Sequence, residues 1–167
     1  MLKAPTPKII APTLAVALLL FTATGGFSQS REIKILEKAL TSALGEKTNF
    51  GTKRVVTVRE ELKPGGRTLI IGVVANNSPT QAGLRHGIFS DVTKILKVLK
   101  SWDWPSKVER AMIGEYYAES HGPNMEARPV LMCTISSEKI SKTNWNSFDP
   151  RRIPDVVDNL QIDDIIK

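Results

Sequence analysis

The feature that most constrains the fold is a long apolar stripe with helical spacing in the middle of the chain. Its members recur three and four positions apart and are Leu84, Ile88, Val92, Ile95, Leu99 and Trp102. This spacing places them on one face of an α-helix, and that face has to be buried against another layer of structure. Ser78 suits an N-cap and Pro79 a first turn, so a helix of about 24 residues is predicted from there. Gly83 and Gly87 weaken the first turns, which leaves open a start nearer Ser90.

Strand-like segments flank this predicted helix on both sides. Before it, segments 53–62 and 67–75 are rich in β-branched and apolar residues and enclose a Pro-Gly-Gly turn. After it, segments 107–118 and 127–136 have the same character and enclose a second turn. Two hairpins joined by a long helix predict a two-layer α+β fold. In it, the helix lies across one face of a four-stranded, mainly antiparallel sheet.

Shorter helices are predicted on either side of this body. Residues 31–44 carry apolar side chains at helical spacing and are followed by Gly45, a natural C-cap. This helix either links the body to the N-terminus or packs on the body. Near the C-terminus, 153–160 has the pattern of a short closing helix, and 161–167 is a tail expected to fray or dock weakly.

The N-terminal segment has the composition of an export signal or a membrane anchor. Two lysines precede an unbroken apolar run at 14–21, and a stretch of small and polar residues follows. That order is typical of a signal peptide, with cleavage predicted after Gly25 or Ser28. Alternatively, the 19 residues 9–27 form an uncleaved hydrophobic helix, close to the roughly 20 residues needed to cross a bilayer. Both interpretations place the body outside the cytoplasm: secreted, periplasmic or at the cell surface. A buried helix of a cytosolic protein is a third interpretation.

Length and composition fit one domain after this segment. The chain has 167 residues, of which 41% are hydrophobic and 24% charged, as in an ordinary globular protein. These values exclude a disordered polyampholyte and a multi-span membrane protein. We expect a signal peptide or signal anchor at 1–28, a linker or amphipathic helix at 29–50, and a single α+β domain at 51–167.

Few residues suit catalysis, metal binding or cofactor binding. The one cysteine, Cys133, lies in an apolar strand segment and is expected to be a buried thiol. The two histidines, His86 and His121, are not spaced as zinc ligands. The sequence also has neither a Gly-rich phosphate-binding loop nor a G-x-S-x-G nucleophile elbow. We therefore expect no cofactor and no metal, and we favour a non-enzymatic protein. The alternative is a small extracytoplasmic hydrolase that uses His121 with a nearby carboxylate such as Glu119.

Charged and aromatic residues point instead to surface recognition. The formal net charge is +6, and the basic residues are concentrated before the second hairpin. Lys94, Lys97 and Lys100 lie outside the apolar stripe of the long helix. Trp145 and Phe148 stand out in a polar segment, where they either plug the core or serve as exposed anchors for a partner. These five residues are the candidate partner-binding site. The leading hypothesis is an exported or membrane-tethered domain that binds a protein or an envelope component.

A further alternative assigns binding of anionic lipid or nucleic acid to the basic half of the body. Its additional basic residues lie in the first hairpin and are Lys53, Arg54, Arg59, Lys63 and Arg67. Such a surface attracts polyanions over a long range, but charged strand residues also serve simply to keep sheet edges apart. Aromatic residues, which stack on single-stranded nucleic acid, make up only 6% and disfavour that ligand. An uncleaved segment 9–27 is itself a membrane contact.

Overall fold

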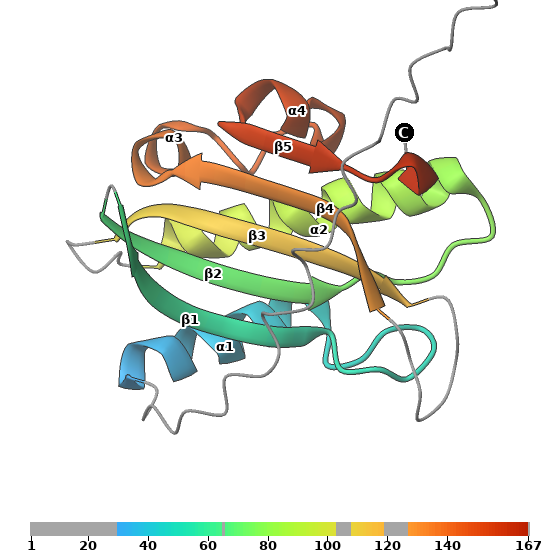
Figure 1. The fold of residues 1–167 in the computed structure, drawn as a ribbon, viewed down its shortest axis with the longest axis horizontal. Helices are drawn as coiled ribbons and strands as arrows, with labels where there is room; N and C mark the ends of the chain where they lie inside the picture. Colours follow the sequence, from blue (N-terminus) through green and yellow to red (C-terminus); the bar gives the residue numbers. More distant parts are fainter. Residues whose placement is uncertain (1–29, 65, 103–107, 119–126, 167) are drawn as a thin grey trace, which may run out of the picture.

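The fold is that of a computed structural model, which describes residues 30–64, 66–102, 108–118 and 127–166. It is α+β, with a five-stranded mixed sheet and helices (Figure 1). Three predicted features lie outside the described residues. They are the N-terminal hydrophobic segment, the second predicted turn, and the hydrolase pair of His121 and Glu119.

The sheet follows the order of the chain from one edge to the other, β1-β2-β3-β4-β5. The strands are β1 (Val55–Lys63), β2 (Gly66–Val74), β3 (Val108–Ala118), β4 (Ala127–Ser136) and β5 (Asn159–Ile162). The pairs β1–β2, β3–β4 and β4–β5 are antiparallel, whereas β2 and β3 are parallel. The parallel pair follows from α2 (Gln81–Ser101), because a helix between two strands returns the chain to the same end of the sheet.

The prediction of four strands was wrong, because the sheet has a fifth. Strand β5 lies where a closing helix and a loosely docked tail were expected, and it pairs with β4 in the register Cys133↔Leu160. The helical pattern before it supports only α4 (Ile153–Val156). Leu160 and Ile162 alternate with Gln161, so the apolar pair turns toward the core while the amide turns away. The remaining short helices are α3 (Ser137–Lys142), η2 (Pro150–Arg152) and η3 (Asp164–Ile166).

Helix α2 buries the predicted apolar stripe against the sheet. The side chains of Leu84, Ile88, Val92, Ile95 and Leu99 are all buried. The helix begins two residues later than predicted, because the N-cap is Thr80 and not Ser78; the Thr80 Oγ1 accepts a hydrogen bond from the Gly83 N–H at 3.1 Å. Neither glycine delays the start to Ser90.

Helix α1 (Arg31–Leu44) is part of the same core. Its buried residues Ile33, Leu36, Leu40 and Leu44 belong to the core cluster shared by α2 and the sheet. Of the two roles predicted for this helix, a linker or a helix packed on the body, the structure therefore shows the second. Both helices lie behind the sheet in the view of Figure 1. Because the chain leaves α1 through a turn and returns as β1, helix and strand run in opposite directions.

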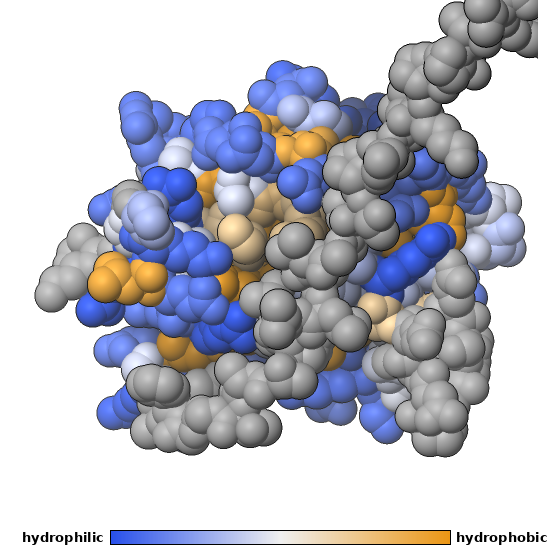
Figure 2. All heavy atoms as spheres, viewed as in Figure 1, coloured by the Kyte–Doolittle hydropathy of each residue, from blue (hydrophilic) through white to orange (hydrophobic). Residues whose placement is uncertain are grey.

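The opposite face of the sheet has no helix over it among the described elements. Figure 2, which views this face, shows hydrophobic side chains between hydrophilic ones. Gly72 and Gly114 are paired across β2 and β3, and the ring of Tyr116 packs over both. Two small hollows on this face have volumes of about 20 and 90 Å³.

Candidate functional site

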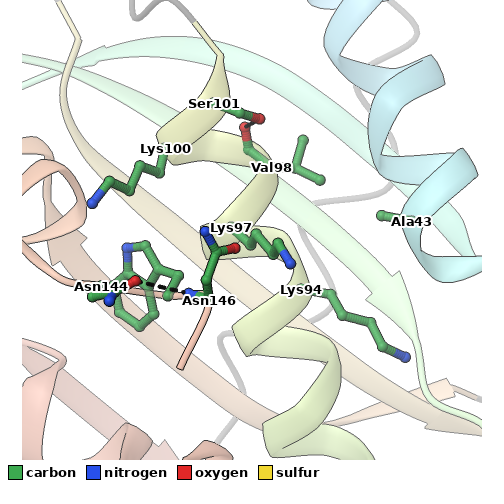
Figure 3. Close-up of a pocket in the computed structure, with 9 residues that line it drawn as sticks. Ala43, Lys94, Lys97, Val98, Lys100, Ser101, Asn144 and Asn146 are labelled. Carbon is green, nitrogen blue, oxygen red and sulfur yellow. Dashed lines mark hydrogen bonds between the residues drawn. The ribbon is translucent and has the colours of Figure 1, made fainter. Parts of the chain in front are cut away.

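A hollow open to solvent lies on the helical side of the molecule (Figure 3). It has a volume of about 630 Å³. Three segments form it: the end of α1, the second half of α2, and the loop after α3. Its lining residues are Ala43, Lys94, Lys97, Val98, Lys100, Ser101, Asn144, Trp145 and Asn146. We call it the basic hollow, since its charged lining residues are all lysines.

Trp145 forms a wall of the basic hollow from a buried position. The residue is only 3% exposed, and its Nε1–H donates a hydrogen bond to the Ile140 carbonyl at 2.8 Å. The half-buried ring of Phe148 packs on it, with ring centroids 4.9 Å apart and planes inclined by 54°. Trp145 therefore plugs the core and fixes the loop, while Asn144 and Asn146 on either side of it stay exposed. Phe148 supports this wall and is not among the lining residues.

The three predicted lysines all reach the basic hollow, but they differ in what they already contact. Lys94 Nζ lies 3.3 Å from Asp91 Oδ1, and Lys100 Nζ donates to the Thr143 carbonyl at 2.7 Å. Lys97 makes no ion pair or hydrogen bond with another described residue. Figure 3 shows the side chains fanning out from α2, with Lys100 reaching toward Asn144, Lys94 toward the opposite side and Lys97 between them.

A buried charged cluster lies beside Lys94, the first lysine of this row. Arg54 precedes β1, and its guanidinium Nη2 forms an ion pair with Asp91 Oδ2 of α2. Two backbone hydrogen bonds hold the Arg54 position, one from its own N–H to Glu46 and one to its carbonyl from Val74. Glu115 of β3 joins them with no exposed surface, and neither of its carboxyl oxygens has a hydrogen-bond partner among the described residues.

Burial of Glu115 determines which charges lie beside Lys94. Loss of solvent, and then the negative charge of Asp91, raise the pKa of Glu115 well above its ordinary value, so its neutral form is favoured. Asp91 is then the single negative charge between two cations, Arg54 and Lys94. The cluster does not cancel the positive charge of the lysine row.

The sequence contained signals for this cluster that the prediction missed. Asp91 lies seven residues after Leu84 and beside Val92, on the apolar face of α2. Glu115 follows Ala111 and Ile113 at every second position of β3, so it shares their face on the core side of the sheet. A carboxylate on each of two facing core surfaces requires a buried cation, and Arg54 supplies it.

The basic residues of the first hairpin do not form an uncompensated surface. Each of the five has a carboxylate within ion-pair distance, either on the hairpin itself or on the helices. The pairs are Lys53–Glu37, Arg54–Asp91, Arg59–Glu61, Lys63–Glu61 and Arg67–Glu60. These five cations share four carboxylates, because Arg59 and Lys63 both pair with Glu61, so most of their charge is compensated nearby. Of the three lysines in the basic hollow, only Lys94 has such a partner among the described residues.

The described residues contain little else that suits chemistry. No group of three or more His, Cys, Asp or Glu side chains comes together among them as a metal site. Burial raises the pKa of Cys133 to about 12, so this thiol is a poor nucleophile. A second hollow of about 500 Å³ lies along β4 and β5, and its charged lining residues in the described part are Asp163 and Asp164. No helix in the described ranges is long and apolar enough to span a bilayer.

Comparison with known proteins assigns no family or relative. The chain matches no protein-family model, no curated protein and no solved structure. We therefore infer the function from the basic hollow.

Proposed function

We propose that this protein is an exported, non-enzymatic α+β domain that binds an anionic partner in the basic hollow. The partner is a protein or an envelope component, and the domain is either released or tethered by its N-terminal segment. One observation carries the proposal: three lysines and two exposed asparagines line one hollow, with no acidic side chain among its described lining residues. A volume of about 630 Å³ is within the range of ligand sites in proteins.

Export is supported by the N-terminal pattern and by the buried thiol. A basic start, an apolar run and a small polar stretch follow one another within the first thirty residues. Cys133 is the one cysteine and is buried, so an oxidising compartment offers it no disulfide partner within the chain. Sequencing the N-terminus of protein recovered from cell fractions tests this. A start near Gln29 in a soluble extracytoplasmic fraction, or an intact Met1 in the membrane fraction, supports export. Intact protein in the cytosol contradicts it.

Binding is tested with two triple variants of equal charge. Lys94→Gln/Lys97→Gln/Lys100→Gln removes the row in the hollow. The control, Lys34→Gln/Lys38→Gln/Lys47→Gln, removes three exposed lysines elsewhere. Fluorescence anisotropy of labelled poly-glutamate then measures the affinity of each full chain.

The hollow variant is expected to bind roughly 3- to 150-fold more weakly, since each exposed pair contributes about 0.2–1 kcal/mol. The affinity of the control variant should fall only by the small amount that its lower net charge causes. Equal losses in both variants mean that the charge of the whole molecule, and not the hollow, governs binding.

The other two hypotheses have less support. The hydrolase needs His121 and Glu119, which are outside the described residues. The lipid or nucleic-acid surface depends on the first hairpin, whose basic side chains are paired with carboxylates.

A further inference from the structure

We propose that the basic hollow takes an extended acidic peptide segment of a partner protein, with acidic residues at alternate positions. This inference rests on the proposed function and names the partner class for the same site. It is carried by the arrangement of the three lysines, by the exposed amides beside them and by the absence of acidic side chains from the described part of the lining.

The spacing of the three lysines suits an extended ligand. Lys94, Lys97 and Lys100 follow one another at intervals of three on α2, where neighbouring Cβ atoms are about 5–6 Å apart. The side chains diverge from there, so their ammonium groups are spaced more widely than their Cβ atoms (Figure 3). In an extended peptide, alternate side chains point to the same side and repeat about every 6.6–6.8 Å. A segment with acidic residues at every second position therefore presents its carboxylates at a spacing that suits the row.

The second step concerns shape. Lys94 and Lys100 reach toward opposite sides of the hollow (Figure 3). One compact anion, such as a single phosphate group, cannot contact both. A linear ligand that follows the lysine row of α2 meets the three ammonium groups in turn. Lys97, which has no partner among the described residues, is its central contact.

The third step concerns the neutral groups. Asn144 and Asn146 are exposed, and Asn144 lies on the side of the hollow toward which Lys100 reaches (Figure 3). A side-chain amide has two N–H donors and an acceptor oxygen, so it can pair with both the N–H and the C=O of a peptide backbone. Single-stranded nucleic acid instead requires an exposed ring for stacking. The one ring in the lining, Trp145, is 3% exposed and is held by its hydrogen bond to Ile140.

The test compares two labelled peptides of identical composition against the full chain in a neutral detergent. One has three glutamates alternating with threonines, and the other has its three glutamates in succession. An extended chain turns all three alternating carboxylates to one side, but only two of the successive ones. The alternating peptide is therefore expected to bind about two- to fivefold more tightly, which is the effect of one exposed ion pair. Lys97→Gln should weaken it by a similar factor, and the matched control Lys34→Gln should leave it unchanged.

Each other outcome overturns a defined part of the reasoning. Equal affinity for the two peptides refutes the alternating peptide but leaves an anion site in the hollow, provided that Lys97→Gln still weakens both. If an oligodeoxythymidylate or polyphosphate binds more tightly than either peptide, the ligand of the hollow is a phosphate polymer and the acidic-peptide proposal is refuted. If none of the probes binds up to millimolar concentration, the peptide and the proposed function both fail.

Discussion

Glu115 gives the sharpest test of how the core is built. Its carboxyl group has no exposed surface and faces Asp91 and Lys94 from α2, Arg54 from the segment before β1, and Cys133 from β4. Burial raises its pKa in the native state well above 4.5, the ordinary value that applies in the unfolded chain. We predict that Glu115→Gln stabilises the protein at neutral and alkaline pH, because the amide keeps the shape and cannot ionise.

The sign of this stability change follows from the difference in proton binding at Glu115 between the native and the unfolded state. Below pH 4.5 both states hold the Glu115 proton, and the raised pKa carries no penalty. Above that pH the unfolded chain releases the proton while the native protein retains it, so the native protein is destabilised as pH rises. The loss is up to about 1.4 kcal/mol per pH unit and levels off once pH passes the raised native pKa. The accumulated difference therefore grows between pH 5 and pH 7.

The assay is urea unfolding followed by tryptophan fluorescence at pH 5, 7 and 9, with wild type and Glu115→Gln measured side by side. The advantage of the variant should be small at pH 5 and larger at pH 7. A difference in unfolding free energy that stays constant over this range would show that Glu115 does not keep its proton in the native protein.

Three further predictions concern the same core. Arg54→Met should lower the unfolding free energy at pH 7 by about 3–5 kcal/mol, because it leaves Asp91 buried without its inner cation. Adding Asp91→Leu should recover part of that loss in urea titrations, and no recovery would mean that the two side chains act independently. The thiol of Cys133 should resist a disulfide reagent at pH 8 in native protein and react once urea unfolds the chain, whereas rapid native reaction would contradict its burial. Trp145→Ala should lower the unfolding free energy, measured by chemical denaturation, by about 3–5 kcal/mol. Trp145→Phe should lower it less, since Phe keeps the packing and loses only the hydrogen bond to Ile140. An unchanged unfolding free energy for Trp145→Ala would mean that this residue is not part of the core.

The sequence predicted those parts of the fold that depend on local periodicity. Helix α1 begins and ends where its apolar spacing indicates, and α2 differs only in its first turn. Strand β5 was missed because it has only four residues, too few to show a pattern of their own. Its conformation depends on pairing with β4, about twenty-five residues earlier, as in the hydrogen bond from Asn159 to Thr134.

The candidate site shows the same division. The spacing of Lys94, Lys97 and Lys100 is a local property, and their common placement on α2 could be read from it. The other wall depends on contact between segments distant in the chain, such as Lys100 with Thr143, 43 residues later. Arg54 looked like one more exposed cation, since nothing in its own neighbourhood places it against Asp91.

The central claim is that an acidic ligand lies along the lysine row of α2. Acylation of lysine side chains, read by mass spectrometry with and without the alternating acidic peptide, tests it at each residue. The account predicts that the peptide protects Lys94, Lys97 and Lys100 together while Lys34 and Lys38 react as before. Protection confined to other lysines, or an unchanged pattern at a peptide concentration that saturates binding, would contradict it.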